Sequence, residues 1–182
     1  MHVILISGKA QHGKDTTAAV IQEVLEERGE SVLITHYADL VKYICKTFFA
    51  WDGNKDEYGR SLLQYVGTDV VRAQKPDYWV GFIADILKMF EGEWDYVIIP
   101  DTRFPNEVSV MKENFGAYHL RVHRPGFISP LSAEQQMHPS ETALDNSSPD
   151  AVLINNSDTE TLRHTIVNWL DSEFEYHSKK KS

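Results

Sequence analysis

Two glycines five residues apart, Gly8 and Gly13, stand directly before a lysine in the segment "GKAQHGKDTT". The apolar run "HVILIS" precedes this segment and a helix-like pattern follows it. Glycines let backbone N–H groups approach phosphate oxygens, a helix N-terminus favours an anion, and Lys14 adds a positive charge. The segment predicts a phosphate-binding loop that consists of Gly8, Lys9, Ala10, Gln11, His12, Gly13, Lys14, Asp15 and Thr16.

Asp15 departs from the usual form of such a loop, which has a Ser or Thr hydroxyl for Mg²⁺ directly after the lysine. Aspartate is favourable in the first turn of a helix, and its carboxylate can bind Mg²⁺ or the waters around it. We expect Asp15 either to act at Mg²⁺ or to cap the helix. Thr16 keeps a hydroxyl beside the loop, and we expect it at the α-phosphate.

A second group of polar residues ends the apolar run in "WDYVIIPDTR". If this strand neighbours the first one, the Asp101 carboxylate lies beside the glycine loop, where it can act at Mg²⁺. Arg103 could then bridge a transferring phosphoryl group. An Asx turn with an arginine ion pair explains the same two residues equally well. We expect Glu107 to cap the following helix or to interact with its dipole.

Two further segments place arginines near these groups. Arg72 and Trp79, in "GTDVVRAQKPDYWV", could clamp the phosphate and base of an acceptor, although Trp79 also fits an apolar core stripe. In "HLRVHRPG", Arg124 at the root of a loop could close on phosphates, whereas we expect Arg121 to be solvated.

Two polar motifs complete the set. The motif "HPSE" (138–141) offers only two potential metal ligands, so we expect Glu141 at a hinge or a substrate contact. Asn155 follows the last predicted strand and could line an adenine pocket.

The hydrophobic pattern indicates how these residues are positioned. Apolar stripes at helical spacing in 40–49 and 79–90 predict core-facing helices. Residues 37–93 show no strand pattern and predict a helical insertion, and 125–149, rich in Pro, Ser and Asn, predict a mobile flap. Five apolar runs predict the strands of a mostly parallel α/β sheet: His2–Ile6, Val32–His36, Tyr96–Pro100, Tyr118–His123 and Ala151–Asn155.

Composition narrows the class of protein. The chain has 182 residues, which fits one domain, and its net charge of −9 argues against a broad nucleic-acid surface. The basic run at 178–181 is interpreted as a chain end. No apolar stretch suits a membrane span, and we expect no leader, because Met1 runs directly into a predicted strand. The single Cys45 fits a helix face in a reducing compartment, so we expect a cytoplasmic protein.

The chain resembles the deoxynucleoside monophosphate kinases of tailed phages and their bacterial relatives. The resemblance rests on "GKAQHGKDTT", "LQYVGTD…YWV", "VIIPDTRFPNE", "GAYHLRVHRPG" and "HPSE", and it extends from residue 3 to about 170. Phosphomevalonate kinases of the animal type are similar in Gly-Lys-Asp and Asp-Thr-Arg, so these two motifs do not choose the acceptor. The "GTD…YWV" and "RPG" blocks favour a nucleotide.

This resemblance implies a three-layer P-loop NTPase fold in which 37–93 bind the acceptor and 125–149 form the lid. It implies transfer from ATP and Mg²⁺ to a deoxynucleoside monophosphate, and dimers occur in the family. The implied catalytic residues are Lys14, Asp101, Arg103 and Arg124; the ATP-binding residues are Gly8–Thr16 and Asn155. The implied acceptor residues are Asp69, Arg72, Trp79, Arg103 and Glu141; Asp15 and Asp101 would serve Mg²⁺.

Two alternatives stay open at the level of sequence. One is a kinase of another phosphorylated small molecule, such as phosphomevalonate or dephospho-coenzyme A. The other is a nucleotide-binding module without catalysis, in which Asp15 has weakened the binding of Mg²⁺.

Overall fold

The computed structural model describes residues 1–156 and 158–174, so the basic run at 178–181 lies outside the described residues. Its centre is a five-stranded sheet in the order β2-β3-β1-β4-β5, in which every strand pair is parallel. The five predicted strands are confirmed, although β2 ends two residues early. Their bounds are β1 (His2–Ser7), β2 (Val32–Ile34), β3 (Tyr96–Ile99), β4 (Tyr118–His123) and β5 (Ala151–Ile154).

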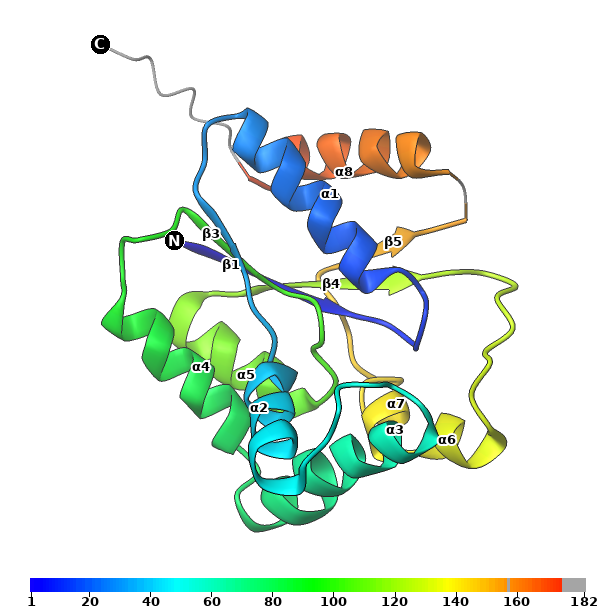
Figure 1. The fold of residues 1–182 in the computed structure, drawn as a ribbon. Helices are drawn as coiled ribbons and strands as arrows, with labels where there is room; N and C mark the ends of the chain where they lie inside the picture. Colours follow the sequence, from blue (N-terminus) through cyan, green and yellow to red (C-terminus); the bar gives the residue numbers. More distant parts are fainter. Residues whose placement is uncertain (157, 175–182) are drawn as a thin grey trace.

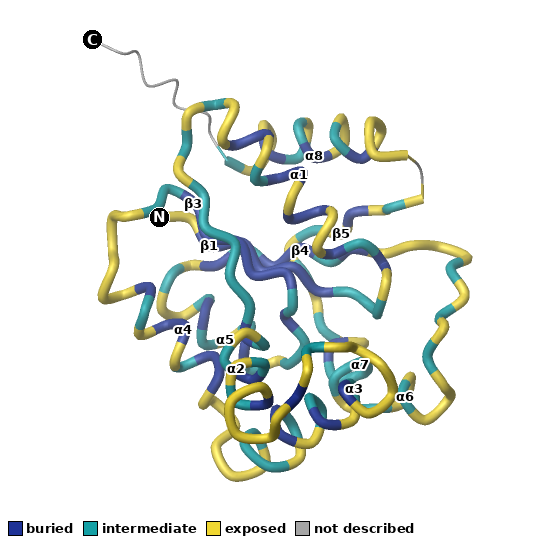
Figure 2. The backbone as a smooth tube through the Cα atoms, in the orientation of Figure 1, coloured by how far each residue is buried: buried dark blue, intermediate teal, exposed yellow. Residues whose placement is uncertain are grey.

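Helices cover both faces of the sheet and make three layers (Figure 1). In β1, Val3 and Leu5 face one apolar cluster while Ile4 and Ile6 face another, because successive strand side chains point to opposite faces. Helices α1 (Lys14–Glu27) and α8 (Thr159–Glu173) pack on the second cluster. The central strands β3, β1 and β4 contain the most buried part of the sheet (Figure 2), whereas the edge strand β5 exposes Val152 and Ile154.

The opposite layer is built largely from the segment between β2 and β3. It contains α2 (Ala38–Phe49), α3 (Glu57–Gln64), the π-helix η1 (Tyr65–Arg72) and α4 (Tyr78–Met89), followed after β3 by α5 (Pro105–Phe115). As predicted, residues 37–93 contain no strand. Cys45 is fully buried in this layer, which fits its predicted place on an apolar helix face.

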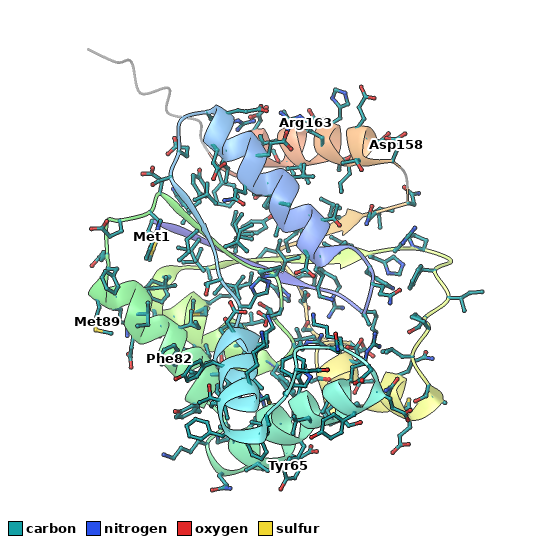
Figure 3. The ribbon with its side chains drawn as sticks, in the orientation of Figure 1. Met1, Tyr65, Phe82, Met89, Asp158 and Arg163 are labelled. Atoms are coloured by element: carbon teal, nitrogen blue, oxygen red, sulfur yellow. The ribbon has the colours of Figure 1, made fainter. Side chains whose placement is uncertain are left out.

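The predicted core stripes are only partly correct in this layer. Phe48 and Phe90 are 71% and 50% exposed, because each lies near the end of its helix, beyond the part that packs on the sheet. Phe82 and Met89 also lie at the surface of α4, and Tyr65 lies at the surface of η1 (Figure 3). Helical spacing therefore predicted the helices but overestimated the width of their buried faces.

The predicted flap, residues 125–149, is called the lid from here on. It contains two short helices, α6 (Ala133–Met137) and α7 (Pro139–Thr142). In Figure 1 this segment leaves the sheet after β4 and returns beneath it before β5. Within 1–156 and 158–174, no helix combines the length and the apolar character that a membrane crossing requires. Because all strands are parallel, the segments that follow them meet at one edge of the sheet, and the candidate site lies there.

Candidate active site

The phosphate-binding loop predicted from the sequence connects β1 to α1. Gly13 is the N-cap of α1 with φ of 95°, a left-handed conformation that suits glycine. A Cβ at Gly13 would collide with the Asn155 side chain, whose Nδ2 donates a hydrogen bond to His12 O at 2.9 Å. Asn155 therefore holds the loop from the end of β5, and no contact among residues 1–156 and 158–174 assigns it to an adenine pocket.

Lys14 folds back over its own loop. Its Nζ donates to the carbonyl oxygens of Gly8 at 2.8 Å and Lys9 at 2.9 Å. Burial, together with the positive charge of Arg103, lowers the pKa of Lys14 to about 8. An anion placed in the loop would stabilise the charged lysine, so this site favours negatively charged ligands.

Asp101 follows β3, as predicted, but both of its carboxylate oxygens already have partners. Oδ1 accepts from Tyr37 N at 3.0 Å and Oδ2 from Ala38 N at 2.9 Å, so Asp101 holds the first turn of α2. Asp15 is 85% exposed, and its Oδ1 lies 3.4 Å from His36 Nε2. That hydrogen bond is the main cause of the lowered pKa of Asp15 and of the raised pKa of His36.

The residues at this edge fit a magnesium ion that arrives with a nucleotide. Among the described residues, no group of three or more His, Cys, Asp or Glu could hold a metal by itself. Mg²⁺ does not need such a group, because it commonly binds through one or two carboxylates together with phosphates and water. The exposed Asp15 carboxylate beside Lys14 supplies that kind of ligand.

The lid reaches the phosphate-binding loop through α7. Glu141 Oε2 accepts from Ala10 N at 2.9 Å, and Glu141 Oε1 lies 2.5 Å from Arg103 Nη1. Arg103 also donates to Ser140 O at 3.1 Å. The "HPSE" motif is explained in part by local structure, since His138 Nδ1 accepts from Ser140 N and Pro139 begins the helix.

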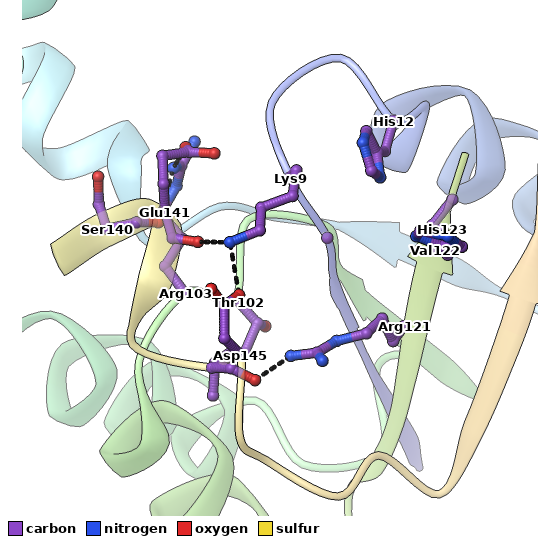
Figure 4. Close-up of a pocket in the computed structure, with 12 residues that line it drawn as sticks. Lys9, His12, Thr102, Arg103, Arg121, Val122, His123, Ser140, Glu141 and Asp145 are labelled. Carbon is purple, nitrogen blue, oxygen red and sulfur yellow. Dashed lines mark hydrogen bonds and ion pairs between the residues drawn. The ribbon is translucent and has the colours of Figure 1, made fainter. Parts of the chain in front are cut away.

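The lid also contacts the helices that precede β3. His138 Nε2 lies 3.9 Å from Asp69 Oδ1 of η1, and Asp69 is 57% exposed. Asp69 thus lies on the side of η1 that faces the lid. A cavity of about 100 Å³ remains between the lid, the phosphate-binding loop and the ends of β3 and β4 (Figure 4).

The predicted clamp of Arg72 and Trp79 is wrong for Trp79. The indole is 2% exposed and donates to Gly67 O at 2.8 Å, so Trp79 belongs to the core stripe of α4. Arg72 lies in a buried ion pair with Glu107 at 2.5 Å and stacks 3.8 Å from the centre of the Phe104 ring. These contacts occupy the guanidinium within the protein.

Glu107 has the capping role expected for it. Its carboxylate accepts from Arg103 N at 2.6 Å and Phe104 N at 3.0 Å, at the start of α5. Burial raises the pKa of Glu107 to about 7, although Arg72 opposes this shift. Together Glu107 and Arg72 tie the backbone that carries Arg103 to η1.

The two arginines of "HLRVHRPG" both contribute to this edge. Arg124 N donates to His12 Nδ1 at 3.3 Å, and its guanidinium lies 4.9 Å from the centre of the Phe127 ring. Arg121 is not simply solvated, as the sequence had suggested, because it donates to Leu144 O and to Ser147 Oγ. It therefore holds the C-terminal end of the lid.

The structure brings most of the predicted residues to one edge of the sheet. The phosphate-binding loop, Arg103, Arg124 and Glu141 adjoin one another, whereas Trp79 lies in the core. Sequence reasoning missed His36 and the lid carboxylate Asp145, which pairs with Lys9 at 2.5 Å. His36 ends a predicted strand at the same edge, and that position was the only available signal.

This fold and this loop define an α/β protein of the P-loop type. The fold matches the adenosine phosphosulfate (APS) kinase CysC of Mycobacterium tuberculosis, solved in complex with AMPPNP and APS, with a TM-score of 0.55. That match covers 93% of this chain and 97% of the other at 10% sequence identity, so it supports the fold alone.

Sequence comparison defines the family. Residues 36–166 match the family model described as deoxynucleotide monophosphate kinase, and the chain belongs to that family. A protein of Acanthamoeba polyphaga mimivirus named for the same kinase is 29% identical, covering 92% of this chain and 95% of its own length. The deoxynucleotide monophosphate kinase of Enterobacteria phage T4 is 34% identical over 61% of this chain and 44% of its own length.

Proposed function

We propose that this protein transfers the terminal phosphoryl group of ATP to a deoxynucleoside 5′-monophosphate, giving ADP and the diphosphate. The observation that carries the proposal is the meeting of the phosphate-binding loop with Arg103 at the carboxyl edge of the sheet, in a chain of this family. An acceptor phosphate oxygen attacks the γ-phosphorus, and the bond to the β–γ bridging oxygen breaks. Such transfer requires positioning and neutralisation of charge.

The donor side is assigned to the loop and α1. Backbone N–H groups of 8–16 would bind the β- and γ-phosphates at the N-terminus of α1. Lys14 would exchange its carbonyl partners for phosphate oxygens, as its Nζ lies within the loop. Thr16 would contact the α-phosphate, and Arg124 would approach from the root of the lid beside His12.

Mg²⁺ would neutralise charge on the donor phosphates, with Asp15 as its carboxylate ligand or as an acceptor for its waters. Asp101 has a second role, because it fixes the first turn of α2 through two backbone N–H groups. Asp101 also lies near His36, because its negative charge helps to raise the pKa of that histidine. We therefore assign Asp101 to orientation of this edge as well as to the hydration shell of the metal.

The acceptor side is assigned to the space between η1 and the lid, where Asp69 faces His138. Arg103 would bridge the acceptor and the transferring phosphates, since its guanidinium faces the loop from the end of β3. Arg72 helps to hold the backbone of Arg103 in place, because it pairs with Glu107, which binds Arg103 N. The identity of the family disfavours phosphomevalonate and dephospho-coenzyme A as acceptors.

The deciding experiment measures ADP release with ATP and a panel of acceptors. The panel holds the four deoxynucleoside monophosphates, the ribonucleotides, phosphomevalonate and dephospho-coenzyme A. We expect turnover with at least one deoxynucleoside monophosphate. Binding of ATP without turnover on any acceptor would overturn the proposal.

A pair of arginine variants tests the assignment of the site. We expect Arg103→Ala to lower kcat by about 10³-fold or more, the order that a phosphate-bridging arginine supplies. Arg163→Ala is the matched control, because Arg163 pairs with Glu27 on the opposite layer of the protein. Equal rates for the Arg103 variant and the control, both folded by circular dichroism, would contradict the role of Arg103.

A further inference from the structure

The Glu141 carboxylate is bound to two groups of the candidate site that we expect to bind phosphate. It accepts a hydrogen bond from the backbone N–H of Ala10 in the phosphate-binding loop and pairs with the Arg103 guanidinium. Its side chain is 8% exposed. Carboxylates and phosphates bind arginine and backbone N–H groups in the same way, through oxygens that accept charge-assisted hydrogen bonds. The lid thus places an anion of the protein in an anion site.

Several contacts hold the lid in this position (Figure 4). Lys9 Nζ donates to Glu141 O at 2.6 Å and pairs with Asp145, and Arg121 binds the Leu144 carbonyl. The cavity left beneath the lid is about 100 Å³. Ligand pockets for drug-sized molecules usually measure about 300–1,000 Å³. Binding of a nucleoside triphosphate in this space therefore requires the lid to move.

We propose that Glu141 is a tethered anion that occupies Arg103 and the Ala10 N–H group of the phosphate-binding loop in the absence of donor, and that it makes the loop selective for polyphosphates over single phosphates. The inference rests on the proposed function, because it concerns the donor site of that reaction. Glu141 is thereby a specificity-determining residue of the lid.

The selectivity follows from what each ligand gains on displacing the carboxylate. A ligand with one phosphate group replaces the contacts of Glu141 with Ala10 and Arg103 by equivalent ones, so its net gain is small. A polyphosphate also reaches Lys14 and the other backbone N–H groups at the N-terminus of α1. A monophosphate kinase needs this distinction, because its acceptor carries a single phosphate that could otherwise occupy the donor loop.

The test uses inorganic phosphate and pyrophosphate as probes, with dissociation constants measured by calorimetry on the full chain. In Glu141→Gln, the amide still accepts from Ala10 but presents an N–H group toward Arg103 instead of a charge. We expect phosphate to bind Glu141→Gln at least ~10-fold more tightly than wild type, which is about 1.4 kcal/mol. We expect the preference for pyrophosphate over phosphate to fall in the variant.

Asp145→Asn is the matched control. It removes one negative charge from the same lid. Asp145 differs from Glu141 because it pairs with the Lys9 side chain and, within the described part of the chain, contacts no backbone N–H group of the loop. A change of less than about 3-fold for this variant supports occupancy by Glu141. Equal gains in phosphate affinity in both variants would show that the effect is long-range electrostatics, and this would overturn the proposal. Unchanged or weaker phosphate binding by Glu141→Gln would overturn it as well.

A second measurement needs no variant and no turnover. Limited proteolysis of wild-type protein should cut within 125–149 faster when pyrophosphate displaces Glu141, while inorganic phosphate at the same concentration should change the cutting rate little. Protection of the lid by pyrophosphate would overturn the proposal. Because both tests measure binding, their failure is distinguishable from failure of the acceptor panel, which concerns turnover.

Discussion

Lys14 gives the sharpest prediction about pH. Burial and the charge of Arg103 lower its pKa to about 8 in the empty loop. Bound phosphates favour the charged form, so the pKa of Lys14 rises in the complex. Affinity for polyphosphate is then fully present below the pKa of the free protein, near 8, and decreases as the pH rises above it. At pH 9 about nine-tenths of the free lysines are neutral, so the dissociation constant of pyrophosphate should be roughly 10-fold weaker than at pH 7.

Calorimetric titration with pyrophosphate between pH 7 and 9.5 measures this effect. Repeating the titrations in buffers of different ionisation enthalpy gives the protons taken up, which should approach one per bound ligand near pH 9. Lys14→Arg is the control, because arginine stays charged across this range. Ionisation of pyrophosphate itself affects both proteins equally, so the difference between the two profiles gives the contribution of Lys14. A wild-type profile that matches the Lys14→Arg profile, with no additional proton uptake, would show that Lys14 stays charged up to pH 9.5 in the empty loop, and the reasoning from burial would be refuted.

Three further changes test other parts of the site. Glu107→Ala leaves Arg72 buried without its partner and should lower the free energy of unfolding by about 3 kcal/mol, measured by urea denaturation; a loss below about 1 kcal/mol would contradict this account. Gly13→Ala places a methyl group against Asn155 at a left-handed φ, so nucleotide binding should be lost while the protein stays folded by circular dichroism. Asp15→Ser should keep ATP binding but shift the Mg²⁺ dependence of turnover, and an unchanged Mg²⁺ titration would leave Asp15 only a capping role.

The sequence predicted the sheet well because strands leave local signals. The apolar runs of β1 and β3 and the glycine loop after β1 fixed the order of elements and the edge at which the site lies. Once strands are parallel, residues that directly follow them must meet, and this placed Asp101, Arg103 and Arg124 correctly. The prediction of Arg103 beside the loop needed no information on packing.

Hydrogen bonds between residues that are distant in the sequence leave no such local signal. Trp79 suited both a core stripe and a substrate clamp, and only the contact of its indole with Gly67 decides for the core. Likewise, only the hydrogen bonds from Tyr37 and Ala38 show that the Asp101 carboxylate holds the first turn of α2, in addition to the role at the metal that we propose for it. Periodicity reports which face of an element is apolar. It does not report which polar atom, more than a hundred residues away, completes a hydrogen bond, as Glu141 does for Ala10.

The contacts around the phosphate-binding loop divide into those that can persist when a nucleotide binds and those that must be exchanged. Asn155 holds the loop through the carbonyl of His12, and this contact leaves the N–H groups of the loop available. The contacts of Lys14 and Glu141 must be exchanged. Lys14 donates hydrogen bonds to carbonyl oxygens of the loop, and Glu141 accepts one from a loop N–H group. If the donor binds as we propose, its binding releases one cation and one anion of the protein together. Since Arg103 is freed by the same step, arrival of the donor would itself make the transferring arginine available to the acceptor.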